Sequence, residues 1–237
     1  MSLVLKRYSM IGDGLSHVGF GALAIASALG LAPLAVAVPV VVLAAVLLLR
    51  LSQNSKIKGD AAIAMISSSA LAIGVVVISV TTGMNTEVSS YMFGSVLSLS
   101  RGDAVLSVIL SIAVLLAFTL LYPRIFAVTF DETFSRATGV RTDAYNTLIA
   151  VLTAVTVVLG MRMMGALLIS SLIIFPALSA MRVCKSFRAV VLCSAAISVV
   201  CFILGVLASY FWETPTGASV VIADLICFGL FSLLGKK

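Results

Sequence analysis

Charged side chains are scarce in this chain of 237 residues. Asp, Glu, Lys and Arg together make up 10% of the sequence, whereas soluble domains usually carry about 25%. Hydrophobic residues account for 62%, and the mean hydropathy is +1.25. This composition excludes an ordinary soluble domain and indicates an integral membrane protein. The apolar runs do not alternate with polar residues as the strands of a membrane barrel do, so we predict an all-α, polytopic helical protein.

Several catalytic and nucleotide-binding motifs are also missing. The chain contains no GxxxxGK[ST], GxGxxG or HExxH motif, and His17 is its single histidine. One histidine cannot form a histidine-rich metal cage. Because the chain lacks a nucleotide-binding loop, we expect the energy for its function to come from an ion gradient or from another subunit.

Cysteine and net charge add two further exclusions. The four cysteines, Cys184, Cys193, Cys201 and Cys227, form no CxxC pair, and we interpret them as small hydrophobic side chains of the interior. The net charge of +6 is compatible with nucleic-acid binding, but Lys and Arg are scattered singly or in pairs between apolar runs. Membrane topology explains this distribution better, so we expect no nucleic-acid partner.

Repeated apolar runs, separated by short polar breaks, define the membrane helices, each of which needs roughly 20 residues. The runs cover residues 12–31, 33–50, 61–82, 104–122, 145–161, 165–181, 190–210 and 218–234. We therefore predict about eight transmembrane helices in a single domain over residues 1–237. The runs at 145–161 and 165–181 lie so close together that one overlong helix is the alternative.

The positive charges decide between these alternatives. If all the runs cross the membrane separately, thirteen of the 15 Lys and Arg side chains lie on one side, and only Arg101 and Arg162 lie on the other. The thirteen are Lys6, Arg7, Arg50, Lys56, Lys58, Arg124, Arg136, Arg141, Arg182, Lys185, Arg188, Lys236 and Lys237. Positive loops mark the cytoplasmic side, so we predict a tight hairpin between the two runs and both chain ends in the cytoplasm. The outer segment 83–103 is predicted to lie along the surface or to dip back into the protein.

Asp13 and His17, in the stretch IGDGLSH, are the sharpest chemical feature. Four residues apart on a helix, they share one face and can provide two ligands for zinc, manganese or ferrous iron. Two protein ligands bind a metal weakly, which suits a transport site because the ion must leave again. The alternative interpretation is that Asp13 caps the start of the helix and His17 simply packs.

Other acids allow two interpretations each. Asp224 lies within the apolar run VVIADLICF, where a hydrogen bond between helices or a place on an ion pathway explains it equally well. Glu213, in the outer turn WETPTGAS, is either a solvated loop acid or a group that attracts arriving cations. Asp60 and Asp103 are interpreted as solvated residues at the membrane interface.

Five stretches with a common order and spacing extend over essentially the whole chain. They are VLKRYSMIGDGLSH (4–17), YMFGS (91–95), DETFSRATGV (131–140), GALLISSLIIFPALSA (165–180) and TPTGASVV (214–221). Together they resemble one family, the membrane permease subunits of bacterial ABC importers for zinc, manganese and iron. Each stretch alone is a weak signal, but the ordered set is specific.

This resemblance implies a transport subunit of the bacterial cytoplasmic membrane that is not itself an enzyme and binds no permanent cofactor. The implied partners are a second permease copy, a cytoplasmic pair of ABC ATPases that binds ATP, and an extracytoplasmic metal-binding protein. Asp13 and His17 match the family's acid and histidine, which contact the passing ion. The segment MRVCKSFR matches the region that meets the ATPase, with residues 131–141 as a second contact. The implied coupling residues are Arg182, Lys185, Ser186, Phe187 and Arg188.

The chain also departs from the family pattern. Family members usually have a further membrane helix before VLKRYS, and we expect this chain to lack that usual first helix. Ser95 stands where many relatives carry an acid, so no ligand is expected there. We favour zinc as the cargo. Manganese and iron remain alternatives, because one acid and one imidazole suit all three metals.

Two other functions are kept as alternatives. The first is a gradient-driven secondary transporter in which Asp13, His17 and Asp224 form an ion relay, although the sequence contains no visible inverted repeat. The second is a membrane assembly subunit that does not transport.

Overall fold

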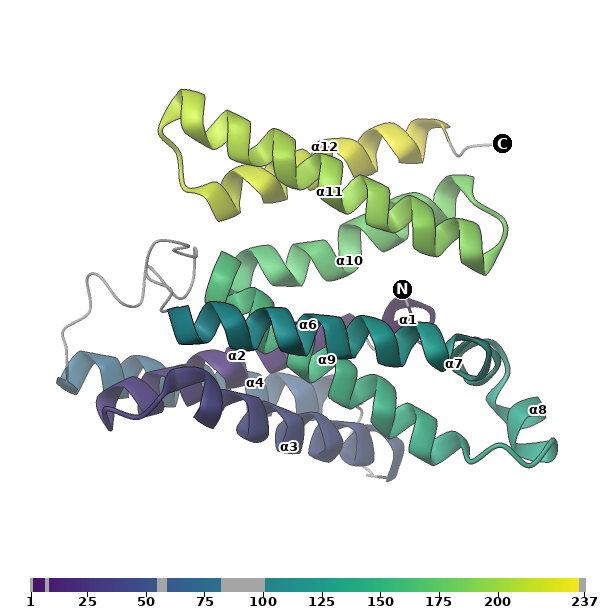
Figure 1. The fold of residues 1–237 in the computed structure, drawn as a ribbon, viewed down its shortest axis with the longest axis horizontal. Helices are drawn as coiled ribbons and strands as arrows, with labels where there is room; N and C mark the ends of the chain where they lie inside the picture. The colour runs from purple at the N-terminus through teal and green to yellow at the C-terminus, as the bar shows by residue number, and fades with distance from the viewer. Residues whose placement is uncertain (1, 7–8, 55–58, 82–100, 235–237) are drawn as a thin grey trace.

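The computed structural model describes residues 2–6, 9–54, 59–81 and 101–234. Within these ranges the regular structure is helical and no strand occurs, which confirms the all-α prediction. The helices, shown in Figure 1, are α1 (Ser2–Leu5), α2 (Ser9–Ala28), α3 (Pro33–Asn54), α4 (Gly59–Thr81), α6 (Arg101–Leu120), α7 (Tyr122–Phe130), α8 (Glu132–Ala137), α9 (Thr142–Met164), α10 (Ala166–Val183), α11 (Phe187–Trp212) and α12 (Thr216–Leu234). Each predicted apolar run coincides with one long helix of this series.

Fewer than eight of the described helices have the length and hydropathy of a membrane span. Six do so on their own, namely α3, α4, α9, α10, α11 and α12. A seventh span results if α6 and α7, which are bent by 69° relative to each other, count as one broken crossing. Eight long helices are present in the described part of the chain, as predicted. Only six or seven membrane spans pass this test of length and hydropathy. α2 does not pass the test, because Asp13, His17 and several glycines lower its mean hydropathy.

The long helices lie side by side and alternate in direction (Figure 1). The α8–α9 and α10–α11 connections lie at one end of the molecule, and the α2–α3, α9–α10 and α11–α12 turns lie at the other. The cytoplasmic end, as assigned by the positive charges, is the end with α1, α8 and the α10–α11 connection. α9 and α10 are separate antiparallel helices joined at Gly165, whose φ is 90°. The predicted tight hairpin is therefore confirmed.

α2 occupies the centre of the larger part of the bundle, where it contacts α3, α4, α9 and α10. Its buried side chains, such as Leu15, Phe20 and Leu23, fill the main core. The approach to α4 is close, because a Cβ atom at Gly21 would lie 2.7 Å from the carbonyl oxygen of Ala70. A glycine is needed at this position because a larger residue would push the two helices apart.

The helices α10, α11 and α12 pack together around a smaller core that includes Ala180, Val190, Ile197 and Cys201. The four cysteines are free, as expected from their spacing. Cys201 is fully buried, and Cys184, Cys193 and Cys227 are half-buried against the same core. Their interpretation as small apolar packing residues agrees with these positions.

The part of the chain around Arg124 and Arg136, which the positive charges assign to the cytoplasmic side, forms the short helices α7 and α8. Pro123 stands in the first turn of α7, where its missing N–H group costs nothing. Asp131 caps α8, because its side chain accepts a hydrogen bond of 2.9 Å from the backbone N–H of Phe134. The stretch YMFGS, including Ser95, and most of the outer segment 83–103 lie outside the described residues.

Candidate metal site and the cytoplasmic contacts

Asp13 and His17 lie on one face of α2, as predicted. The Nε2 atom of His17 is 3.8 Å from the Oδ2 atom of Asp13. α2 begins at Ser9, and no acidic residue stands in its first turn, so Asp13 belongs to the helix interior. The alternative interpretation of Asp13 as the helix cap is therefore wrong, since a cap must stand at the helix start.

The pair borders a cavity of about 210 Å³ between α2, α4 and α10. Asp13, Ser16, His17 and Ser170 supply its polar groups, and the other lining residues are Phe20, Leu71, Ala166 and Leu167. The Oγ atoms of Ser16 and Ser170 are 3.4 Å apart and connect α2 with α10. Leu71 lies halfway along α4, about 18 Å from its start at 1.5 Å per residue. The cavity therefore lies at mid-height of α4, within the first two to three turns of α2 and beside the first turns of α10.

The geometry of the pair allows both side chains to contact one ion. Bonds from a divalent transition metal to imidazole nitrogen or carboxylate oxygen are about 2.0–2.2 Å long, so a separation of 3.8 Å is within reach of a shared ion. The exposed fractions are 28% for the His17 side chain and 41% for the Asp13 side chain, which leaves both accessible from the cavity. Among the described residues no group of three or more His, Cys, Asp or Glu side chains is arranged to hold a metal. Any further metal ligands would have to be water molecules, the serine hydroxyls of the cavity, or residues that do not line it.

Asp224 belongs to a different part of the bundle. Asp224 is 1% exposed, and its Oδ2 atom accepts a hydrogen bond of 3.2 Å from the Oγ atom of Ser171. This bond joins α12 to α10. Asp224 does not line the cavity of Asp13 and His17. The position matches the interpretation of Asp224 as an interhelical hydrogen-bonding residue.

Glu213 stands at the end of α11, in the outer turn between α11 and α12. It is exposed and adopts the left-handed conformation, with φ of 50° and ψ of 37°. Its backbone N–H donates a hydrogen bond to the carbonyl oxygen of Ser209 and closes the helix. The structure does not bring Glu213 to the Asp13–His17 cavity.

The expected ATPase-coupling residues are not equivalent. Arg182, Lys185 and Arg188 are exposed around the connection from α10 to α11. Ser186 caps α11, because its Oγ atom accepts a hydrogen bond of 3.3 Å from the backbone N–H of Ala189. Phe187 differs from the others, since it is buried with 9% exposure and cannot serve as a surface contact in this conformation.

Phe187 instead connects the α10–α11 loop with α7. Its ring centroid lies 5.6 Å from that of Tyr122 and 5.0 Å from that of Phe126. The guanidinium carbon of Arg188 lies 5.8 Å from the centroid of the Tyr122 ring. The loop is therefore packed against α7, whose C-terminal end leads directly into α8.

Sequence reasoning missed a polar network that joins Lys6, which directly follows α1, to α8 and α9. The Nζ atom of Lys6 is 3.2 Å from Oε2 of Glu132 and donates a hydrogen bond to Oδ1 of Asn146. The side-chain amide of Asn146 donates a bond of 3.1 Å to Oε1 of Glu132. Lys6 and Glu132 both lie in stretches that carry the family resemblance, but nothing in their spacing predicts contact across 126 residues.

Charges around Glu132 favour its ionised form. Burial raises the pKa of this carboxyl, but hydrogen bonds from Asn146 and Lys6, with the charges of Lys6 and Arg136, outweigh burial and leave the pKa below its ordinary value. Arg136 lies 3.7 Å from Oε1 of Glu132 and 3.3 Å from Oδ1 of Asp143. The network is therefore a set of charged and polar partners that joins Lys6 to α8 and the start of α9.

Comparison with known proteins agrees with this architecture. The chain is 29% identical over 235 residues to the manganese import system permease protein ScaB of Streptococcus gordonii, which covers 99% of this chain and 84% of that protein. It is 27% identical over 228 residues to the high-affinity zinc uptake system membrane protein ZnuB of Haemophilus influenzae, covering 96% of this chain and 87% of that protein.

A solved structure shares the fold. PsaBC from Streptococcus pneumoniae, determined in complex with Fab, superposes with a TM-score of 0.86 at 28% identity, over 97% of this chain and 83% of that chain. The sequence profile of the ABC 3 transport family matches residues 1–235, which is nearly the full length. The chain therefore belongs to the ABC 3 transport family and is an ABC transporter permease, a multi-pass protein of the bacterial cell membrane.

Proposed function

We propose that this permease moves a divalent transition metal into the cell, driven by ATP hydrolysis in partner subunits, and that Asp13 and His17 contact the metal on its way. The observation that carries the proposal is the Asp13–His17 pair, 3.8 Å apart inside the bundle and open to a cavity of about 210 Å³. A carboxylate and an imidazole within a membrane helix are costly unless they serve a pathway or have partners.

The proposed cargo is a class of metals. The site offers one oxygen and one nitrogen ligand, which zinc, manganese and ferrous iron all accept. The relatives described above are named for manganese and for zinc. The two ligands do not favour zinc over manganese or ferrous iron. The metal specificity is therefore measured by competition between the three ions for uptake.

The proposed partners are a second permease copy, a pair of ABC ATPases on the cytoplasmic face and an extracytoplasmic metal-binding protein. Arg182, Lys185 and Arg188 provide an exposed basic surface for the ATPase, beside α7. Movement at this surface reaches α7 through Phe187 and reaches α1 through Glu132 and Lys6. Because α1 precedes α2 in the chain, a displacement of α8 changes the position of the helix that holds Asp13 and His17.

The secondary-transporter alternative has less support. An ion relay through Asp13, His17 and Asp224 would need the three groups near one another. Asp224 is instead bonded to Ser171 between α10 and α12 and does not border the cavity. Uptake that continues after ATP depletion would nevertheless favour this alternative over the ABC importer.

The test is metal uptake by vesicles that contain the permease, its ATPase and the binding protein. We expect Asp13→Asn and His17→Gln each to reduce uptake at least tenfold while the complex still assembles. Leu71→Val is the matched control, because Leu71 lines the same cavity but has no ligand atom, and we expect it to retain most uptake. Full uptake by the Asp13→Asn/His17→Gln double variant would refute the metal contact.

A further inference from the structure

The outer end of α11 carries three consecutive aromatic side chains that the fold leaves uncovered. Tyr210 is 80% exposed, and Phe211 and Trp212 are each 75% exposed. The rings of Tyr210 and Phe211 pack edge to face with their centroids 5.7 Å apart, but this contact hides little of either ring. A contiguous group of large exposed aromatic rings is unfavourable in water, so this end of the helix requires a partner.

The turn that follows these residues is closed without the aromatic rings. The buried hydroxyl of Ser209 donates a hydrogen bond to the backbone carbonyl oxygen of Thr214 and lies 3.1 Å from the Oγ1 atom of Thr216. The Oγ1 atom of Thr214 is 2.7 Å from the Oγ atom of Ser219. These bonds fix the passage from α11 to α12, so the turn does not need the exposed rings.

The exposed surface of α11 is apolar from Arg188 to Tyr210. The exposed residues between these two are all apolar, namely Leu192, Ala195, Ala196, Val199, Val200, Ile203, Leu204, Val206 and Leu207. Directly beyond the three rings, the polar residues Glu213, Thr214 and Thr216 are exposed. The exposed surface therefore changes from apolar to aromatic to polar along one helix.

The length of α11 places this change at a membrane boundary. α11 is 26 residues long and has the length and hydropathy of a membrane span. From Arg188 to Tyr210 the helix rises about 33 Å, and the hydrocarbon core of a bilayer is about 30 Å thick. The α11–α12 turn lies at the opposite end of the molecule from the α10–α11 connection (Figure 1). With Arg188 on the cytoplasmic side, the three rings stand where the hydrocarbon of the outer leaflet meets the headgroups.

We propose that Tyr210, Phe211 and Trp212 bind the lipid surface of the outer leaflet and hold the α11–α12 hairpin at the headgroup layer. The phenol O–H of Tyr210 and the indole N–H of Trp212 donate hydrogen bonds to ester and phosphate oxygens of the lipids. The ring of Phe211, which has no polar atom, stays with the upper acyl chains.

The directions of the rings favour lipid over a protein partner. Successive helical residues are about 100° apart, so the three side chains leave the helix on different sides. A protein that docks from one direction, such as the extracytoplasmic metal-binding protein, would cover only part of them. Lipid reaches every exposed side of the helix end and covers all three rings.

Trp212 is the only tryptophan of the chain, so its fluorescence reports on this position alone. The test places the full-length permease in phosphatidylcholine nanodiscs whose acyl chains carry bromine, a quencher, either near the headgroup or near the chain end. We expect the shallow bromine to quench Trp212 roughly twofold more strongly than the deep bromine, and iodide in the water to quench it weakly. Trp212→Leu/Val200→Trp is the matched control. Val200 is exposed midway between Arg188 and Glu213, so a tryptophan there should show the opposite order.

A second variant tests whether the rings act together. Tyr210→Ser/Phe211→Ser removes two exposed rings without opening the core. It should increase the quenching of Trp212 by iodide, because the end of the hairpin then moves toward the water. Equal quenching by iodide in this variant and in the wild type would refute the joint anchoring.

Two results for the wild type would overturn the proposal. Strong quenching by iodide with little quenching by either brominated lipid would place Trp212 in water. Protection from iodide by added extracytoplasmic binding protein would then assign the rings to that protein. Stronger quenching by the deep bromine would place Trp212 inside the hydrocarbon core. No readout involves metal or ATP, so the lipid contact succeeds or fails independently of the proposed function.

Discussion

Lys6 and Glu132 form an ion pair of 3.2 Å between the residue that follows α1 and the short helix α8. The Lys6 side chain is 8% exposed, so its charge is largely removed from water and depends on its partners. Asn146 contacts both members of the pair and ties them to α9. The pair connects α8 with the part of the chain that leads from α1 into α2, the helix that holds Asp13.

Replacement of Lys6 tests this connection. Lys6→Met should destabilise the protein by about 1–3 kcal/mol, because Glu132 and Asn146 both lose the hydrogen-bond donor that Lys6 supplies. Thermal unfolding in detergent measures the loss. The Lys6→Met/Glu132→Gln double variant should lose less than the sum of the single variants. If the connection transmits movement, Lys6→Met should also lower the amount of metal imported per ATP hydrolysed. Additive losses of stability, together with an unchanged amount of metal per ATP, would contradict the connection.

The low pKa of Glu132 predicts how this region responds to acid. Its folded-state pKa lies below the ordinary value of 4.5, so its ion pair stabilises the protein fully above that value. The contribution disappears as the pH falls through the ordinary value and then through the lower folded value, where Glu132 takes up a proton. The unfolding temperature of the wild type should therefore fall more steeply on acidification than that of Glu132→Gln. Parallel curves would show that Glu132 contributes nothing to the acid sensitivity.

The close approach of α2 and α4 predicts a strict requirement for glycine. Gly21→Ala places a Cβ atom 2.7 Å from the carbonyl oxygen of Ala70, and backbone cannot move aside as a flexible side chain can. We expect a loss of about 1–3 kcal/mol. Gly229→Ala is the matched control, because a Cβ atom there meets nothing within 4 Å. Similar unfolding temperatures for the two variants would argue against the close contact.

Asp224 is predicted to be structural. Ser171→Ala removes the described hydrogen-bond donor to a carboxylate that is 1% exposed, and it should cost about 1–3 kcal/mol. Asp224→Asn keeps the size of the side chain and should retain metal uptake per assembled complex. Abolished uptake in Asp224→Asn, with normal assembly, would place Asp224 on the metal pathway after all.

Phe187 is predicted to hold the α10–α11 connection to α7. Phe187→Ala removes a buried ring that contacts Tyr122 and Phe126, and core Phe→Ala changes cost about 3–5 kcal/mol. Phe134→Ala should change the unfolding temperature little, since Phe134 is 66% exposed. The comparison of the two alanine variants by thermal unfolding decides whether Phe187 acts through packing.

The sequence by itself determined the class of the protein. Long apolar runs can only bury their backbone polar groups as helices in a membrane, and the uneven Lys and Arg content orders the loops, so the α9–α10 hairpin was predictable. The pairing of Asp13 with His17 was predictable as well, because helical periodicity relates residues four positions apart.

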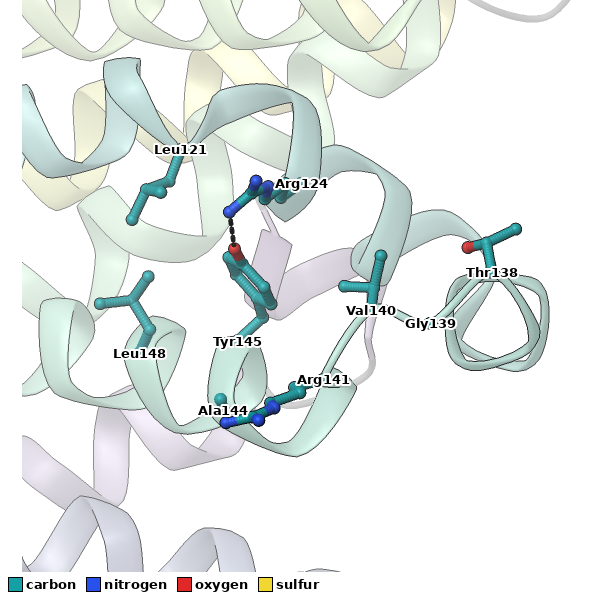
Figure 2. A pocket seen from close by; sticks show the side chains of 9 residues that line it. All are labelled: Leu121, Arg124, Thr138, Gly139, Val140, Arg141, Ala144, Tyr145 and Leu148. Atoms are coloured by element: carbon teal, nitrogen blue, oxygen red, sulfur yellow. Dashed lines mark hydrogen bonds between the residues drawn. The ribbon is translucent and has the colours of Figure 1, made fainter.

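Tertiary structure decided everything that depends on distance across the chain. The ion pair of Lys6 with Glu132, the bond of Ser171 with Asp224 and the burial of Phe187 all join helices that lie far apart in sequence. The same holds for the cavity lined by Leu121, Arg124 and Tyr145, which exists only because the end of α6 meets the start of α9 (Figure 2). Local periodicity indicates which face of a helix a residue occupies, but only the packing of the helices determines what that face meets.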